Sequence, residues 1–151
     1  MKIDKDLIQL GLEIETSDEV IRKLAGMMES KGIIKNTYIQ AVTEREKVSP
    51  TGLASKTIGV AIPHASKEHA NESAVAIGIC EKPIKFQHMG GVGPEVDAEI
   101  VFLMAIDDPK GHLSFLKSVM GILQDGDLLA QIRNSSSKDE VKQLMEVALE
   151  G

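Results

Sequence analysis

The sequence predicts an α/β fold, a mixed β-sheet flanked by helices on both faces. Segments with apolar residues at helical spacing lie at both ends of the chain, and three β-rich runs lie between them. The second run, residues 74–80, is almost entirely apolar, as in a strand covered on both faces. The expected order is two helices, three strands and three helices. This is not a strict alternation, so a mixed sheet is favoured over an all-parallel one.

Two helices are expected in the N-terminal part of the chain. Thr16 and Glu19 fit a capping box at the start of the first, and Gly32 stands where a C-terminal glycine is expected. Asn36 is expected to cap the second helix, which ends near Lys47. The residues at helical spacing that we expect to face the core are Val20, Ile21, Leu24, Met27, Met28, Ile39 and Val42.

The middle of the chain has β-strand character and the C-terminal part returns to helical spacing. Ser-Pro-Thr-Gly at 49–52 breaks the chain into a loop, and the segment 88–94 is too rich in glycine to be regular. The capping box of Ser137 and Glu140 begins a last helix, with Val141, Leu144, Met145 and Ala148 facing inward. Strands are predicted at 58–62, 74–80 and 99–106, and further helices at 113–123 and around 128–132.

Composition limits the class of protein. A length of 151 residues predicts a single domain, 1–151, and 42% apolar with 26% charged residues predicts a folded core. The net charge of −6, without a basic cluster, argues against nucleic-acid binding. The single cysteine, Cys80, cannot form an internal disulfide, and no signal segment or long apolar run occurs. We therefore expect a cytoplasmic protein that does not insert into the membrane.

His64 is the first candidate for chemistry, because it ends the apolar run Gly-Val-Ala-Ile-Pro-His-Ala at 59–65. Pro63 restrains the backbone just before the imidazole. A histidine held in this way can act as a nucleophile, general base, phosphoryl carrier or metal ligand. The ordinary alternative is a half-buried histidine that only terminates a strand.

Two further residues are candidates for an anion site. His112 follows the third predicted strand at the start of a helix, where α/β sheets collect ligands, and helix N-termini favour anions. Arg45 lies in the charged segment 44–47. Each has an ordinary alternative, as a helix-start histidine and as a solvated charge. His69 and His88 are expected to be bystanders in polar loops. No tight His/Cys/Asp cluster supplies three zinc ligands, so neither a metal nor a cofactor is expected.

These segments together resemble one family. The motifs that carry the resemblance are Glu-Arg-Glu-Lys-Val-Ser-Pro-Thr-Gly-Leu at 44–53, Ile-Gly-Val-Ala-Ile-Pro-His-Ala at 58–65, the strand at 101–106, and Asp-Pro at 108–109 followed by His112. They are similar to enzyme IIA of the bacterial phosphoenolpyruvate-dependent sugar phosphotransferase system, of the fructose/mannitol-like type. Three extra residues within 54–57, relative to mannitol-type members, favour the galactitol-specific group.

The resemblance implies a phosphoryl relay. His64 would accept a phosphoryl group on Nε2 from the phosphocarrier protein HPr and pass it to a cysteine of the cognate enzyme IIB, which serves a membrane IIC. Arg45 and His112 would flank the phosphohistidine, and the hydroxyls of Thr51 and Ser66 are weaker candidates for donors to the same anion. The alternative is a regulatory, nitrogen-related enzyme IIA that acts by phosphorylation-dependent binding of other proteins.

Overall fold

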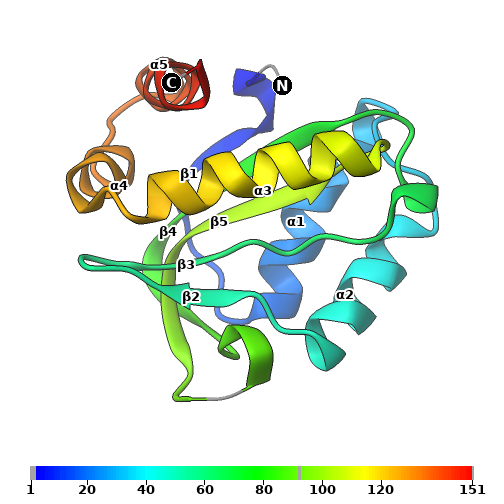
Figure 1. Cartoon of the computed structure of the whole chain (residues 1–151), viewed down its shortest axis with the longest axis horizontal. Helices are drawn as coiled ribbons and strands as arrows, with labels where there is room; N and C mark the ends of the chain where they lie inside the picture. Colours follow the sequence, from blue (N-terminus) through cyan, green and yellow to red (C-terminus); the bar gives the residue numbers. More distant parts are fainter. Residues whose placement is uncertain (1–2, 92, 151) are drawn as a thin grey trace.

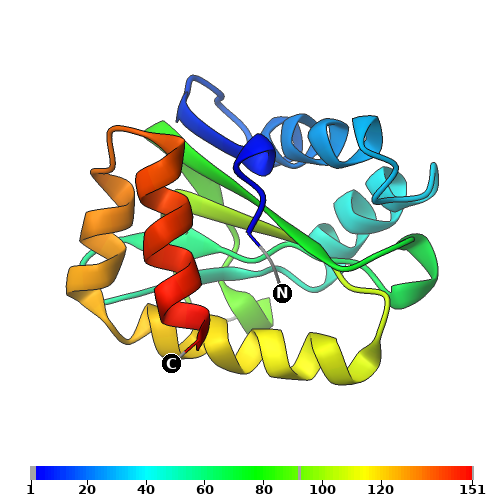
Figure 2. The same ribbon diagram turned by 90° about the horizontal axis from the view of Figure 1, so that it is seen from above.

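A five-stranded mixed sheet separates two layers of helices (Figures 1 and 2). The computed structural model describes residues 3–91 and 93–150. Its elements, in chain order, are β1 (Ile8–Leu12), α1 (Ser17–Ser30), α2 (Tyr38–Val48), β2 (Gly52–Ala54), β3 (Gly59–Ala61), β4 (Ala74–Phe86), β5 (Val96–Ala105), α3 (Pro109–Leu123), α4 (Gly126–Arg133) and α5 (Lys138–Glu150), with short 3-10 helices at Lys5–Leu7, Lys67–His69 and Met89–Gly91.

The strand order in the sheet is β1-β4-β5-β3-β2. The pairs β4–β5 and β2–β3 are antiparallel, whereas β1–β4 and β3–β5 are parallel, so the predicted mixed sheet is confirmed. Two strands were missed by the sequence prediction. β2 has only three residues, and β1 carries Gly11 with a positive φ of 60° inside a five-residue run, so neither gives a clear alternation of apolar and polar positions.

Successive residues of β5 face opposite helical layers, as the two-residue period of a strand requires. Val101, Leu103 and Ala105 pack in one apolar cluster with residues of α1 and α2. Ile100, Phe102 and Met104 pack in the other cluster, with residues of α3, α4 and α5. Figure 2 shows the sheet between α1 and α2 on one side and α3 on the other. Helices on both faces are therefore confirmed.

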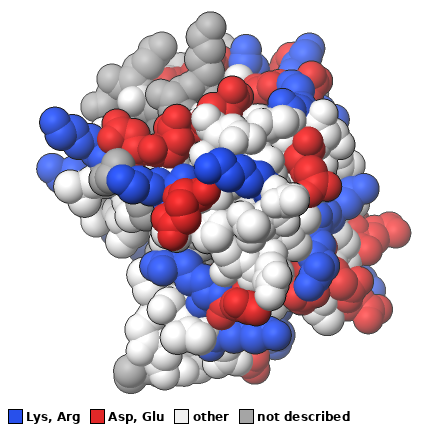
Figure 3. All heavy atoms as spheres, turned by 90° about the vertical axis from the view of Figure 1, so that its right-hand side faces the viewer, with Lys and Arg blue, Asp and Glu red and all other residues white. Residues whose placement is uncertain are grey.

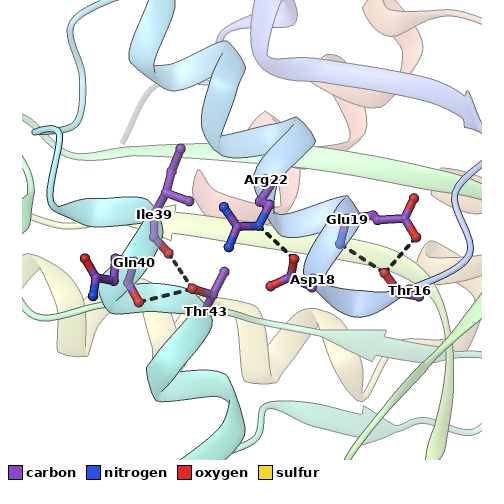
Figure 4. A network of polar contacts seen from close by, with 7 residues as sticks. All are labelled: Thr16, Asp18, Glu19, Arg22, Ile39, Gln40 and Thr43. Atoms are coloured by element: carbon purple, nitrogen blue, oxygen red, sulfur yellow. Dashed lines mark hydrogen bonds and ion pairs between the residues drawn. The ribbon is translucent and has the colours of Figure 1, made fainter.

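The ends of the helices test the capping predictions. Thr16 caps α1 as predicted: its Oγ1 accepts from the amide of Glu19 at 3.2 Å and donates to the carboxylate of Glu19 at 2.9 Å (Figure 4). Gly32 follows the end of α1 with φ 71°, as a C-terminal glycine does. The prediction for Asn36 is wrong, because the N-cap position of α2 belongs to Thr37, which makes no side-chain capping bond.

The C-terminal helices begin close to where the sequence places them. α3 starts four residues before the predicted position because Asp108 caps it, accepting from the amide of Lys110 at 3.1 Å, and Pro109 is favourable in the first turn. The amide of Glu140 donates to the hydroxyl of Ser137 at 3.2 Å, which confirms this side of the second capping box. Within residues 3–91 and 93–150, no helix combines the length and the apolar character needed to cross a membrane.

The topology brings two chain segments to one edge of the sheet. β3 and β5 are parallel neighbours, so the residues that follow both strands leave the sheet at the same edge, on the right-hand side of Figure 1. These are the segment 62–67 and the segment 106–108. Ligand sites of α/β sheets form at edges of this kind.

Candidate functional site

The segment that leaves β3 is fixed to its neighbours on both sides before it reaches His64. The amide of Ile62 donates to the carbonyl of Thr51 at 3.3 Å, and the amide of Met104 donates to the carbonyl of Pro63 at 3.0 Å. His64 itself pairs with Met104 in a bridge of parallel type. Since Pro63 also fixes its own φ, the backbone at His64 has little freedom.

The imidazole of His64 is oriented by its own chain. Its Nδ1 lies 2.8 Å from the carbonyl oxygen of Ile62. A carbonyl can only accept, so Nδ1 carries the proton of this contact, and in the neutral ring the lone pair is then on Nε2. The residue is 8% exposed and is therefore among the few buried polar residues of the described structure. His64 lines two hollows.

The first hollow, which we call the polar hollow, has a volume of about 190 Å³. Four side chains with charge or hydroxyl groups surround it besides His64: Arg45 of α2, Ser66 and Lys67 of the following segment, and Asp108 at the start of α3. Arg45 and Lys67 are cationic and Asp108 is anionic, so the charged side chains around this hollow sum to a net positive charge, which suits a small anion such as a phosphoryl group.

The second hollow, which we call the apolar hollow, has a volume of about 590 Å³. His64 and Arg45 also line it, so both residues lie where the two hollows meet. Val48 and Met120 are 83% and 42% exposed, unusual values for such apolar side chains. The other lining residues are Ser49, Pro50, Thr51, Ile62, Met89, Gly90, Gly91 and Leu116.

Arg45 lies in the last turn of α2, where a cation is stabilised by the partial negative charge of the helix C-terminus. Its side chain is exposed. Among the residues that the structure describes, no carboxylate forms an ion pair with its guanidinium. The donors of this guanidinium are therefore available to an anion.

Glu46, beside Arg45, points inward and was missed by the sequence prediction. It is 9% exposed, and its carboxylate accepts from both the amide and the hydroxyl of Thr51, at 2.8 and 2.7 Å. Burial raises the pKa of this carboxyl, although the two bonds from Thr51 and the charge of Arg45 act in the opposite direction. One sequence signal could have found it, because Glu46 follows the buried Val42 by one helical turn.

The other predicted site residues lie as follows. Thr51 is 2% exposed and its hydroxyl donates to Glu46, whereas the resemblance to the family implied a hydroxyl donor to the phosphoryl group. Ser66 is exposed and lines the polar hollow. His112 lies in the first turn of α3, and its side chain is outside the described part of the structure.

The two remaining described histidines are not among the residues that line the two hollows, and each makes a local contact. Nδ1 of His69 lies 2.8 Å from the hydroxyl of Thr37, and Nδ1 of His88 lies 2.8 Å from the carbonyl of Met89. Over the described ranges, 3–91 and 93–150, no group of three His, Cys, Asp or Glu side chains is placed to hold a metal ion.

Comparison with known sequences identifies one family. Residues 1–147 match the profile of the family described as "Phosphoenolpyruvate-dependent sugar phosphotransferase system, EIIA 2". The galactitol-specific EIIA component of Escherichia coli K12 is 27% identical over 122 residues, which cover 81% of each chain. The mannitol-specific enzyme IIA component of Staphylococcus aureus N315 is 28% identical over 145 residues, which cover 95% of this chain and 94% of that protein.

Solved structures agree with this result. The crystal structure of IIA mannitol from Escherichia coli superposes with a TM-score of 0.81 at 25% identity, over 96% of this chain and 99% of that one. The complex of enzyme IIA and phosphorylated enzyme IIB for mannitol, also from Escherichia coli, gives 0.80 at 25% identity, over 97% and 98%. Nitrogen regulatory protein IIA-Ntr from Neisseria meningitidis gives 0.76 at 18% identity, over 95% of each chain, a likeness of fold alone.

Proposed function

Because this chain belongs to the type 2 EIIA family of the phosphoenolpyruvate-dependent sugar phosphotransferase system, we propose that His64 is its phosphoryl-carrying residue. The observation that carries this proposal is the placement of His64 and Arg45 where the polar and apolar hollows meet. The donor is HPr and the acceptor is a cysteine of the cognate enzyme IIB, which in turn serves a membrane IIC. The proposed location is the cytoplasm, and residues 1–151 are proposed to form one such domain.

The orientation of the ring supports nucleophilic attack by Nε2. With the proton held on Nδ1 by the carbonyl of Ile62, the lone pair of Nε2 attacks phosphorus while the bond from phosphorus to the donor nitrogen breaks. The electron pair of that bond leaves with the donor imidazole. The positive charge left on the ring of His64 is offset by the same carbonyl oxygen. The cysteine thiolate of IIB then attacks the phosphorus and forms a bond from sulfur to phosphorus, while the bond from phosphorus to Nε2 breaks and its electron pair returns to the ring of His64.

The polar hollow is suited to the charge of the transferred group. Phosphoryl transfer depends mainly on positioning and on neutralising the equatorial oxygens. Arg45 provides a planar fork of donors on one side, and Lys67 adds a second cation. Ser66 and His112 are proposed as further donors to the same anion.

The apolar hollow is proposed as the centre of the docking surface for HPr and IIB. Val48, Pro50, Leu116 and Met120 form an uncharged patch next to His64, as expected at the centre of a protein interface. Figure 3 shows the right-hand side of Figure 1, where Lys and Arg side chains lie next to Asp and Glu side chains with uncharged surface between them. A carrier that binds two partners in turn needs a small interface, on the order of 1,200 Å² or less.

Transport of a sugar or sugar alcohol is the function that the comparisons favour. The relatives at 27 and 28% identity are named for galactitol and mannitol. The extra residues that suggested the galactitol-like group lie at the tip of the β2–β3 hairpin, where Ser55 bonds to Ile58. This tip is at the left of Figure 1, at the opposite end of β3 from His64. From the relative named for galactitol and from these extra residues we propose a galactitol-like role. The regulatory role is the alternative outcome.

The test is incubation of the chain with phosphoenolpyruvate, enzyme I and HPr, followed by intact mass measurement. We expect one acid-labile phosphoryl group in the wild type and none in His64→Ala. Subsequent transfer to the cysteine of a galactitol-type IIB protein would support transport. Gain of a phosphoryl group by His64→Ala would show that the acceptor is another residue. Transfer to no IIB would favour the regulatory alternative.

The same assay tests the anion site. Arg45→Ala should slow transfer by about 10- to 100-fold, since a charge-assisted hydrogen bond contributes about 1.5–3 kcal/mol. His112→Ala should also slow phosphoryl transfer. Rates within twofold of the wild type in both folded variants would remove these residues from the site.

A further inference from the structure

Helix α2, which carries Arg45, is attached to the backbone around His64 at both of its ends. Near its start, the buried hydroxyl of Tyr38 donates to the carbonyl of Met104 at 2.5 Å. The amide of Met104 in turn holds the carbonyl of Pro63. This first attachment fixes the position of the helix relative to the strand end.

The second attachment is at the end of α2 that faces the site. The carboxylate of Glu46 accepts two hydrogen bonds from Thr51. The carbonyl of Thr51 accepts from the amide of Ile62, whose own carbonyl orients Nδ1 of His64. A continuous series of hydrogen bonds therefore leads from the residue beside Arg45 to the imidazole.

The chemistry of this attachment favours a role in orientation over a role in stability. Moving a carboxylate out of water costs free energy, which two hydrogen bonds offset only in part. The amide and the hydroxyl of Thr51 donate to the two oxygens of the Glu46 carboxylate, and this pair of bonds fixes both the distance and the direction between α2 and the loop that carries Thr51. A pair of apolar residues would fill the same space at lower cost but would leave the loop free to shift along the helix.

We propose that Glu46, acting through Thr51, is a positioning residue that sets the placement of Arg45 relative to His64. The inference rests on the proposed function, because it assumes that the phosphoryl group is carried between these two side chains. The two residues themselves do not contact the phosphoryl group.

The test uses phosphoramidate as the donor, a small molecule that transfers its phosphoryl group with loss of ammonia and needs no docking surface. Thr51→Val removes the hydroxyl with almost no change of shape, and Thr51→Ser restores it. Glu46→Asp keeps the charge and shortens its reach. The matched control is Thr43→Val, because Thr43 is a second buried threonine, whose hydroxyl bonds only to Ile39 and Gln40 within α2 (Figure 4).

We expect Thr51→Val and Glu46→Asp to lower the rate at saturating phosphoramidate by about 10- to 100-fold, as misplacement of reacting groups does. The half-saturating concentration should change by less than about twofold. Thr51→Ser and Thr43→Val should keep the wild-type rate. Because Thr51 acts through Arg45, the change Thr51→Val should slow an Arg45→Ala variant much less than it slows the wild type.

Each outcome decides between defined alternatives. A rate for Thr51→Val equal to that of Thr43→Val, or equal slowing with and without Arg45, overturns the positioning role and leaves the proposed function intact. If Thr51→Val does not fold by circular dichroism, Glu46→Asp decides in its place. If the wild type gains no phosphoryl group on His64 from either phosphoramidate or HPr, the proposed function fails and the positioning role fails with it.

Discussion

Gly59 is the position in β3 where the structure leaves no room for a side chain. A Cβ built there would lie 2.3 Å from the carbonyl oxygen of Asp97 and 2.6 Å from Cγ1 of Val96, both in the neighbouring strand β5. The first distance is 0.7 Å inside the 3.0 Å below which Cβ contacts essentially do not occur. The clash involves backbone, so Gly59→Ala can be accommodated only by moving β3 away from β5.

The expected cost follows from this geometry. Inserting a methyl group into a closely packed position costs typically 1–3 kcal/mol, and a backbone clash belongs at the upper end, at about 3 kcal/mol. For a chain of this length, that corresponds to a melting temperature lower by about 6–12 °C. Without the clash, alanine in a strand would be expected to stabilise the protein by about 0.5–1 kcal/mol, so the sign of the change is informative.

Urea unfolding followed by circular dichroism is the measurement. Gly26→Ala in α1 is the matched control, because a Cβ at Gly26 meets nothing within 4 Å, and alanine should raise helix stability by about 1 kcal/mol. A Gly59→Ala protein within 0.5 kcal/mol of the wild type would refute the reasoning. Since Gly59 begins the strand that leads to His64, we also expect slower phosphorylation in Gly59→Ala.

Three further predictions concern stability and pH. Tyr38→Phe should cost about 1–3 kcal/mol in urea unfolding, because it leaves the buried carbonyl of Met104 without its hydroxyl donor; no loss would contradict the 2.5 Å bond. Thr16→Ala should lower stability by about 1 kcal/mol through loss of the α1 cap, and an unchanged unfolding midpoint would refute that role. Burial raises the pKa of Glu46 above its ordinary 4.5, so the wild type should lose stability relative to Glu46→Gln as pH rises from about 4.5 through the raised pKa. A difference in unfolding free energy between the wild type and Glu46→Gln that stays constant across this pH range would contradict the prediction.

The elements that sequence patterns predicted best are those with a clear period. α1 and α5 have apolar residues at every third or fourth position and a capping side chain at the start, Thr16 and Ser137, and β4 begins with a long apolar run. β1 and β2 are short, and their stability comes from pairing with strands far along the chain, which no local pattern contains. Helix starts were predicted where a capping box marks them, at Thr16 and Ser137. The prediction failed at Thr37, which makes no side-chain capping bond, and at Asp108, which caps α3 four residues before the predicted start.

The candidate site was predictable in part. His64 stood out because a polar residue ends an apolar run, and the structure brings Arg45 to the same two hollows from a different element. Glu46 was not predictable in the same way. A charged residue in a charged segment is expected to face water, and this expectation outweighs its position one helical turn after the apolar Val42, yet in the folded chain Glu46 faces inward toward Thr51.

The strand order has a consequence for the timing of folding. The central strands of the sheet, β4 and β5, are the last two strands in the chain, whereas β1 pairs with β4 across a separation from Ile8 to Ile77. During synthesis, β1 and the β2–β3 hairpin leave the ribosome before β4 and β5, the strands with which they pair, have been made. Closing such long loops is entropically costly until the β4–β5 hairpin is present to receive them. The apolar faces of α1 and α2 are therefore exposed throughout synthesis of the first half, the period in which this chain depends most on protection from aggregation.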